Sequence, residues 1–440
     1  MRRFARERML VAAALLAAST GALLGEGTVA AAAGGTTLRV SVAPDGSPGD
    51  GGSVMQYLSA DGRSVAFVSS ATNLAAGKTD RMRNDVFVRD LDAATTSLAS
   101  VTADGKAGDR DSRSPSLSAD GRYVAFQSDA TDLVAGDTNG QADIFVRDLR
   151  AGVTTRVSVD GAGTQADNFS QSPSISADGR YVAFVSRASN LVPGGSTPLT
   201  ADVYVHDRDS GTTTRVSVPA VNPDEQYNNV QPAISPDGQF VVYASDSPRQ
   251  VTGDTNRKSD IVLFDRQANV RSRVSVAADG TQGNGSSYSP TISADNRYVS
   301  FASSGTNLVA GDTNRRSDVF VYDRLLSRSV RVSAPSGTVE ANGDSSSPSI
   351  SAEGGHVTYT STASNLVEAD TNGGGDVFVT DLSTGTTERV TVSDAGAQVN
   401  AAVTAPPSIS RDGRAVVFTS NAPGLAPRDA YWHQVYLRLR

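Results

Sequence analysis

One five-residue turn recurs through the whole of this 440-residue chain, and it constrains the fold more than any other feature. Its seven copies are SADGR (59–63), SADGR (118–122), SADGR (176–180), SPDGQ (235–239), SADNR (293–297), SAEGG (351–355) and SRDGR (410–414). Consecutive copies lie about 58 residues apart, a period typical of proteins in which each repeat is one supersecondary unit. The sequence therefore indicates seven copies of one unit rather than three unrelated domains.

Each unit follows one plan, which is clearest in the second copy. The segment PSLS (115–118) precedes the turn and YVAFQS (123–128) follows it, and DIFVRDL (143–149) and TTRVSV (154–159) come later. The pattern predicts four strands, A to D, with an Asp-Gly or similar pair forming the A-to-B hairpin. Strand B is apolar on both faces, as in YVAFV (181–185), which suits a sheet covered on both faces by neighbouring sheets. Four-stranded sheets stacked in this way form a β-propeller.

The two ends of the chain predict how the ring closes. The seventh unit ends in VYLRLR (435–440), its strand C, while TTLRVSV (36–42) matches the strand D sequence TTRVSV. We expect this N-terminal strand to pair with the last blade, because closure removes exposed sheet edges. The predicted fold is all-β, a seven-bladed β-propeller with four-stranded blades, formed by residues 34–440 as one domain.

Residues 1–33 have the pattern of an export signal. A charged segment, MRRFARER, precedes an apolar run (9–25), and Ala31 and Ala33 fit a signal peptidase site. We predict a signal peptide over 1–33, a mature chain that begins near Gly34, and a secreted or cell-envelope location. An uncleaved anchor is the alternative, and after cleavage no stable membrane span is expected.

The composition narrows the choice of partners and cofactors. The chain has no cysteine, which excludes disulfides, a thiolate nucleophile and cysteine-ligated metals. Its formal net charge of -8 argues against binding nucleic acid through a basic face. We expect a monomer.

The repeated motif resembles that of a known family. The pattern S-P-x-[IL]-S-x-D-G-R-x-[VI]-A-F-x-S, followed by D-[VI]-F-V-x-D, is similar to the WD40-like Pro-Asp repeats of TolB-type β-propellers. The resemblance covers residues 34–440 and implies the propeller fold. It implies little about function, because the same scaffold serves binding proteins, lyases and peptidase accessory domains.

The connections between strands predict where a functional site lies. The tight A-to-B and C-to-D turns are expected on one face, here called the turn face. The long B-to-C and D-to-A connections are expected on the other, the loop face. Because long loops on a rigid scaffold usually build binding sites, we expect the site on the loop face or at the mouth of the central channel.

Four of the B-to-C loops share D-T-N-x-x-x-D, with an oxygen spacing similar to that of calcium loops in integrin-type propeller repeats. The candidate metal ligands are Asp137, Asn139 and Asp143; Asp254, Asn256 and Asp260; Asp312, Asn314 and Asp318; and Asp370, Asn372 and Asp376. Calcium takes about six to eight oxygen ligands, so backbone carbonyls and waters would complete each site. Gly140 and Gly373 favour the second and sixth units. The alternative is an Asx-type turn followed by a capping aspartate, with no ion.

The seventh unit replaces the acidic loop with an aromatic cluster, Tyr431, Trp432 and His433. These side chains are candidates for stacking on a sugar or anchoring a peptide on the loop face. The alternative is that they pack over the seam where the ring closes.

Catalytic motifs are sparse. The three histidines, His206, His356 and His433, fall on different parts of the predicted blades, and the chain has no G-x-S-x-G motif. We predict an exported, non-enzymatic propeller that binds a protein, a peptide or a cell-envelope glycan through its loop face. Calcium is the one candidate cofactor. The alternative is a secreted carbohydrate-active enzyme, a lyase or hydrolase, that uses carboxylates alone.

Overall fold

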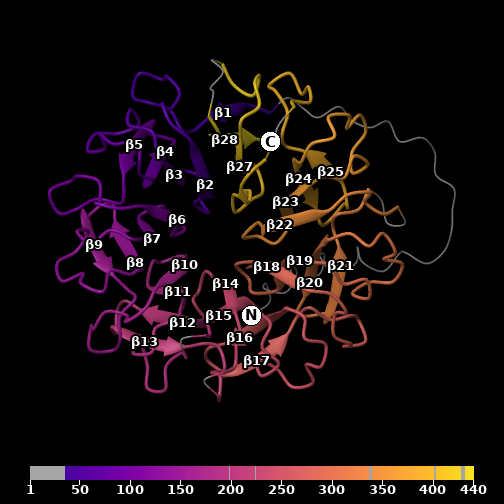
Figure 1. The fold of residues 1–440 in the computed structure, drawn as a ribbon. Helices are drawn as coiled ribbons and strands as arrows, with labels where there is room; N and C mark the ends of the chain where they lie inside the picture. Colours follow the sequence, from indigo (N-terminus) through magenta and orange to yellow (C-terminus); the bar gives the residue numbers. More distant parts are fainter. Residues whose placement is uncertain (1–34, 198, 223, 336–338, 401–402, 428–431) are drawn as a thin grey trace, which may run out of the picture. The chain divides into compact units, whose positions relative to one another are not determined.

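The computed structural model describes residues 35–440 apart from 198, 223, 336–338, 401–402 and 428–431. All regular secondary structure in these residues is β, in seven four-stranded antiparallel sheets set around a centre (Figure 1). The predicted seven-bladed all-β propeller is confirmed. Within the same residues, no helix is long and apolar enough to cross a membrane. The predicted signal peptide, 1–33, lies outside the described residues and stays a prediction.

The strands follow one another in chain order, A to D, in blades one to six. Blades one to three are β2 (Ser53–Leu58), β3 (Ser64–Ser69), β4 (Asp85–Asp90) and β5 (Thr95–Leu98); β6 (Ser112–Leu117), β7 (Tyr123–Ser128), β8 (Asp143–Asp148) and β9 (Val153–Arg156); β10 (Ser170–Ile175), β11 (Tyr181–Ser186), β12 (Asp202–Asp207) and β13 (Thr212–Arg215). Blades four to six are β14 (Asn229–Ile234), β15 (Phe240–Ser245), β16 (Asp260–Asp265) and β17 (Val270–Arg273); β18 (Ser287–Ile292), β19 (Tyr298–Ser303), β20 (Asp318–Asp323) and β21 (Arg328–Arg331); β22 (Ser345–Ile350), β23 (His356–Ser361), β24 (Asp376–Asp381) and β25 (Thr387–Arg389). Blade seven contains β26 (Ser408–Ile409), β27 (Ala415–Ser420), β28 (Gln434–Leu439) and, from the start of the chain, β1 (Thr37–Arg39).

Strands B and C form the buried middle of each blade. In blade two, Phe126 of β7 and Phe145 of β8 are fully buried and stack with their ring centroids 5.9 Å apart. Five other blades contain the same aromatic pair, formed by Phe67 and Phe87, Phe184 and Tyr204, Phe301 and Phe320, Tyr359 and Phe378, and Phe418 and Tyr436. Both faces of each sheet are buried against the neighbouring blades, which is why the middle positions of strands B and C are mostly apolar.

The N-terminal strand closes the ring as the sequence predicts. β1 pairs antiparallel with β28, with Leu38 opposite Leu437. Flanking backbone bonds extend this pairing on both sides, from Leu439 N to the carbonyl of Thr36 and from Val40 N to the carbonyl of Val435, each 2.8 Å long. The last blade therefore has four strands, although its sequence comes from both ends of the described chain.

On the turn face, the A-to-B turns of neighbouring blades are joined by backbone hydrogen bonds. Six of the seven seams have one, from Arg411 to Ala60, Asp61 to Ala119, Ala119 to Ala177, Ala177 to Pro236, Ala294 to Ala352 and Glu353 to Arg411, at 2.9–3.1 Å from nitrogen to oxygen. These bonds form a nearly continuous belt around the channel, because five of the seven turns both donate to one neighbour and accept from the other.

The seam between blades four and five is different because Pro236 has no N–H to donate. Blade five also departs from the repeat, since Asn296 stands where most turns have glycine. Its side-chain amide donates from Nδ2 to Oδ2 of Asp237 in blade four, at 2.6 Å. Asn296 has a φ of 61°, a left-handed conformation that asparagine tolerates better than most residues. The two departures therefore compensate each other across one seam.

We expect Asn296→Gly to destabilise the propeller by about 1 kcal/mol, because it removes the only bond described across this seam on the turn face. The replacement restores the Asp-Gly turn of most other blades, so a purely local view of the turn predicts no loss of stability. Thermal unfolding of the purified chain would measure the difference.

Pro236→Ala supplies the matched background, because alanine restores the backbone donor. In that background the cost of Asn296→Gly should shrink, giving a coupling energy in a double-mutant cycle. Equal costs in both backgrounds would contradict the compensation.

Candidate functional site

The four D-T-N-x-x-x-D loops lie on the loop face, and each presents its aspartates to an arginine from strand D. In blade two, Nη1 of Arg156 lies 3.3 Å from Oδ2 of Asp137 and 3.6 Å from Oδ2 of Asp143. The equivalent pairs are Arg273 with Asp254 and Asp260 at 3.8 and 2.9 Å, Arg331 with Asp312 and Asp318 at 3.3 and 3.5 Å, and Arg389 with Asp370 at 3.3 Å. A guanidinium thus already lies beside the carboxylates that were predicted to hold calcium.

The asparagine of each loop makes an Asx-type turn. Oδ1 of Asn139 accepts from the backbone N–H of Gln141 at 2.9 Å, while its Nδ2 donates to Oδ2 of Asp143 at 3.0 Å. Asn314 and Asn372 make the same two bonds, and Asn256 makes the turn but donates to the carbonyl of Gly283 instead. As arranged, the amide nitrogen of each asparagine faces an acceptor oxygen, and Oδ1 accepts one backbone N–H of the turn.

Blade one, which lacks the motif, shows which contact of the cluster is repeated between blades. In blade one, Lys78 takes the place of Asp137 and Leu98 takes the place of Arg156. Lys78 is buried, and its Nζ lies 2.7 Å from Oδ2 of Asp85, the first residue of strand C. The cation has moved from strand D to the loop while its contact with the strand C aspartate remains. A buried cation beside this aspartate, rather than a set of oxygen ligands, is therefore the repeated feature.

The strand C aspartates also join strands C and D. Oδ1 of Asp143 accepts from the hydroxyl of Ser158 at 2.5 Å, and the same hydroxyl accepts from the backbone N–H of Ile144 at 3.0 Å. Among the described residues, no group of three or more histidine, cysteine, aspartate or glutamate side chains is arranged to hold a metal. The calcium hypothesis stays untested, and what speaks for it is that both buried oxygens of Asp137 accept no hydrogen bond in the described structure.

Burial and the closeness of a second carboxylate raise the pKa values of several aspartates in these loops. Burial, followed by the charge of Asp143, raises the pKa of Asp137 to about 6, although Arg156 opposes the change. The pKa values of Asp260 and Asp312 are also raised to about 6, again first through burial and then through the neighbouring aspartate among other contacts. These clusters therefore carry an energetic cost at neutral pH that protonation relieves.

The described residues of the predicted aromatic cluster in blade seven, Trp432 and His433, differ in their exposure. Tyr431 lies outside the described residues. The side chain of Trp432 is 57% exposed, whereas His433 is half-buried and its carbonyl accepts from the N–H of Ser53 in blade one at 2.8 Å. His433 thus lies at the closure seam, and Trp432 remains available on the loop face.

Large apolar side chains are exposed on several loop-face connections, and Val221 and Val339 are examples in the D-to-A connections, with exposed fractions of 63% and 48%. Among the described residues of the three B-to-C loops without D-T-N, one such side chain is exposed in each, namely Met82 in blade one, Leu199 in blade three and Trp432 in blade seven, with exposed fractions of 89%, 43% and 57%. The four regular loops, all of which the structure describes, expose none.

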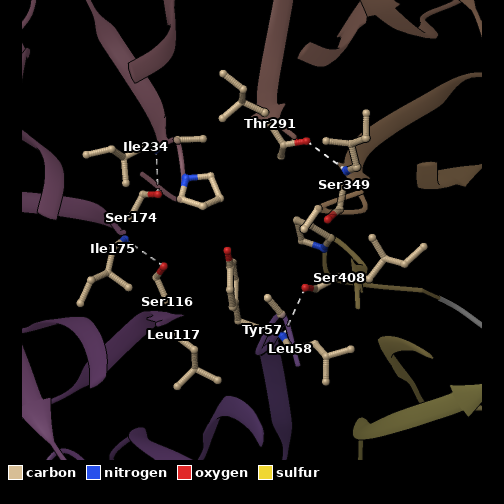
Figure 2. A pocket seen from close by; sticks show the side chains of 18 of the residues that line it. Tyr57, Leu58, Ser116, Leu117, Ser174, Ile175, Ile234, Thr291, Ser349 and Ser408 are labelled. Carbon is tan, nitrogen blue, oxygen red and sulfur yellow. Dashed lines mark hydrogen bonds between the residues drawn. The ribbon is translucent and has the colours of Figure 1, made fainter. Parts of the chain in front are cut away.

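The central channel is the second hollowed feature, with a volume of about 500 Å³. Strand A of every blade contributes to its wall, chiefly through serine or threonine hydroxyls and proline rings. Figure 2 shows Tyr57 extending from β2 into the open centre, at a position that holds serine, threonine or alanine in the other blades. Of the described residues that line the channel, only Arg411 is charged, and it occupies a turn position that is alanine or proline in the other six blades.

The sequence reasoning pointed to the channel mouth but missed Tyr57 and Arg411. Both were readable from the repeat, because each breaks an otherwise uniform column of small residues in the alignment of the seven units. The alternative of a glycan-active enzyme would need carboxylates as acid-base groups. The described channel wall contains no carboxylate or imidazole.

No protein-family model matches the chain, and no curated protein matches it. Solved structures do match. One is an oligogalacturonate lyase in complex with manganese, with a TM-score of 0.55 and 12% identity over 92% of this chain and 96% of that one. Another is the β-propeller domain of the Trilobed protease from Pyrococcus furiosus, with a TM-score of 0.50 and 14% identity over 87% and 95%. At such identities the likeness is one of fold alone.

TolB from Acinetobacter baumannii also matches, at 16% identity and a TM-score of 0.41 over 74% of this chain. The match spans 63% of that chain, so this protein covers less than two thirds of TolB. The resemblance of the repeats to TolB-type propellers correctly predicted the fold, and the activities of these proteins are not carried over.

We expect the melting temperature to be the same in calcium and in chelator, because a guanidinium already balances the paired carboxylates. Calorimetric titration of the same chain with calcium should show no saturable heat. A calcium-dependent rise that disappears in Asp137→Ala and Asp370→Ala would show instead that the ion displaces the arginine, and would establish calcium as a cofactor.

We expect the propeller to become more stable as the pH falls from 7.5 to 5, because the six loop and strand C aspartates with raised pKa values outnumber the two histidines, His206 and His356, whose pKa values burial lowers and which act in the opposite direction. A carboxyl whose folded pKa is about 6 binds protons in the folded state before the unfolded chain does, so protonation favours folding between pH 6 and about 4. Below about pH 4 the salt-bridged carboxylates with lowered pKa values, such as Asp148 beside Arg122, reverse the trend.

Thermal melts across this pH range would measure the effect, and Asp137→Ser should reduce it, since Ser196 fills that place in blade three. The exposed Asp92→Ser is a control that should leave the curve unchanged. A melting temperature that falls steadily from pH 7.5 to 5 would contradict the assignment.

Proposed function

We propose that this chain is an exported, non-enzymatic binding protein that holds a protein partner on its loop face. The observation that carries the proposal is the exposure of one large apolar side chain in each of the three irregular B-to-C loops, Met82, Leu199 and Trp432. Tryptophan and methionine are both enriched in protein interfaces relative to the rest of a protein surface. Among the described B-to-C loop residues, such side chains occur only in the three loops that break the repeat, whereas Val221 and Val339 are exposed in D-to-A connections.

The chemistry of these side chains favours a protein over a glycan. Sugars bind by stacking on aromatic rings, and Met82 and Leu199 offer none. Methionine, leucine and tryptophan instead suit complementary apolar pockets, where each fully buried side chain contributes about 1.5–3 kcal/mol. Tryptophan is also among the residues most enriched at the energetic centres of protein interfaces.

Trp432 and Met82 belong to neighbouring blades, seven and one, on either side of the closure seam. A backbone bond from Ser53 to His433 ties the two blades together beside this point. A partner that covers both side chains would also clamp the seam, and so would stabilise the closed ring. The net charge of -8 further favours a partner with a basic surface, which would associate faster at low salt.

A comparison of two surface variants tests the proposal. Met82→Ser with Trp432→Ser removes the loop-face contacts, and Leu325→Ser with Leu326→Ser removes two similarly exposed apolar side chains from a turn-face connection of blade five. Proteins of the source cell envelope would be captured on the wild-type chain, identified by mass spectrometry, purified, and titrated against all three chains. We expect the loop-face variant to lose at least tenfold in affinity and the turn-face variant to retain it.

Equal affinities for the two variants would refute a loop-face site. Cleavage of a polysaccharide by the purified wild-type chain would instead support the enzymatic alternative.

A further inference from the structure

The largest departures from symmetry in the described channel wall lie where blades seven and one meet. At this seam, Tyr57 replaces the small residue of the A strand and Arg411 replaces the alanine of the A-to-B turn. The two blades are joined directly, by Leu58 N donating to the hydroxyl of Ser408 at 3.2 Å and Arg411 N donating to the carbonyl of Ala60 at 2.9 Å. An aromatic ring and a cation are thus carried by adjacent strands on the wall of one channel.

The wall around them is rich in hydrogen-bond donors. The hydroxyls of Ser116, Ser174 and Ser408 each accept a backbone N–H from strand A of the next blade, at 3.1–3.2 Å (Figure 2). A serine hydroxyl that accepts in this way keeps its own proton to donate. The hydroxyl groups of the channel can therefore serve acceptor oxygens of a ligand.

A second tier of donors comes from the backbone. In β6 the pairing with β7 skips from Arg113 to Ser116, so that Ser114 and Pro115 form a β-bulge. Six blades have a non-glycine residue at this bulge position with a φ of 52–54°, namely Met55, Ser114, Ser172, Gln231, Ser289 and Ser347. In blade five the bulge N–H, of Ser289, reaches Oε1 of Gln231 in the neighbouring blade at 2.8 Å. Gln231 lines the channel, so this N–H is directed at a side chain of the channel wall.

The described wall offers no negative charge to match these donors. Its one charged side chain, Arg411, is 67% exposed at the turn-face mouth, and its only described ion pair is with the exposed Glu353 at 3.6 Å. An exposed pair of this kind is weak, so a ligand can replace the glutamate. Burial raises the pKa of Tyr57, against the effect of the Ser116 hydroxyl, so the phenol stays neutral and does not repel an anion.

We propose that the channel binds a small organic carboxylate, with the carboxylate at Arg411 and the uncharged body of the ligand against Tyr57. The volume of about 500 Å³ lies within the range of ordinary small-molecule sites, so it accommodates a ligand of one or two rings. The proline rings and Tyr57 contact its CH groups, and the serine hydroxyls and bulge N–H groups donate to its oxygens. This site is separate from the loop-face site and does not depend on it.

Matched ligand pairs test the proposal by isothermal titration calorimetry. D-glucuronate with D-glucose, and N-acetyl-L-proline with N-acetyl-L-prolinamide, each differ in the presence of a carboxylate. We expect at least one acid to bind about tenfold more tightly than its neutral counterpart, as a charge-assisted hydrogen bond to arginine would give. The acid that binds identifies the source of the carboxylate, a sugar acid or an acylated amino acid.

The repeat itself supplies variants that should fold. Arg411→Ala and Tyr57→Ser introduce residues that other blades carry at the same positions, and their melting temperatures would confirm that the ring is intact. Arg411→Ala should abolish the preference for the acid, whereas Tyr57→Ser should weaken the acid and its counterpart alike. Arg414→Ala, which removes an exposed arginine of the same turn that does not line the channel, should change neither.

Three results would overturn the proposal. One is that neither acid binds at millimolar concentration. Another is that acid and neutral ligands bind equally, and the third is that Arg411→Ala leaves the preference for the acid unchanged.

Discussion

Closure of the ring is the constraint on which the rest of this structure depends. Seven sheets can enclose one channel only if each blade presents nearly the same faces to its neighbours, so a change at one position disturbs two seams. The backbone hydrogen bonds between the A-to-B turns are one example of this constraint, because at six of the seven seams they hold one turn against the next. The buried aromatic pairs of strands B and C set the spacing of blades in the same way, since close-packed cores tolerate little change in volume.

Under such a constraint, departures from the repeat fall into two kinds. Some come in pairs that cancel, such as Pro236 with Asn296 across one seam and Lys78 with Leu98 within blade one. Others have little or no counterpart in the described structure: Tyr57 and Trp432 have none, and Arg411 has only the weak, exposed ion pair with Glu353. A compensated departure preserves the fold, and selection for the ring alone explains it. An uncompensated departure is costly or neutral for the fold, which is why these three side chains carry the functional proposals.

Much of the fold could be predicted from the sequence because propellers repeat their local rules. The apolar strands, the Asp-Gly hairpins and the closing strand at 36–42 are all encoded by short stretches of residues. The acidic loops were harder to interpret, because their oxygen spacing resembles that of a calcium loop. The contact that this spacing does not show is with Arg156, which follows Asp143 by a whole strand and a turn and meets it only after strands C and D have paired. Spacing within a loop cannot reveal a partner supplied by another strand.

The channel illustrates the converse case, in which the repeat hides a site instead of revealing it. The six bulges hold non-glycine residues at positive φ, a conformation that costs about 1–3 kcal/mol each and persists only when the surrounding structure imposes it. Because the bulges recur around the ring, they shape the wall for any ligand and select none. Selectivity must come from positions that differ between blades. Only the seam between blades seven and one brings an aromatic ring and a charge to the described channel wall, so a ligand is expected to bind off the ring's axis, against that seam.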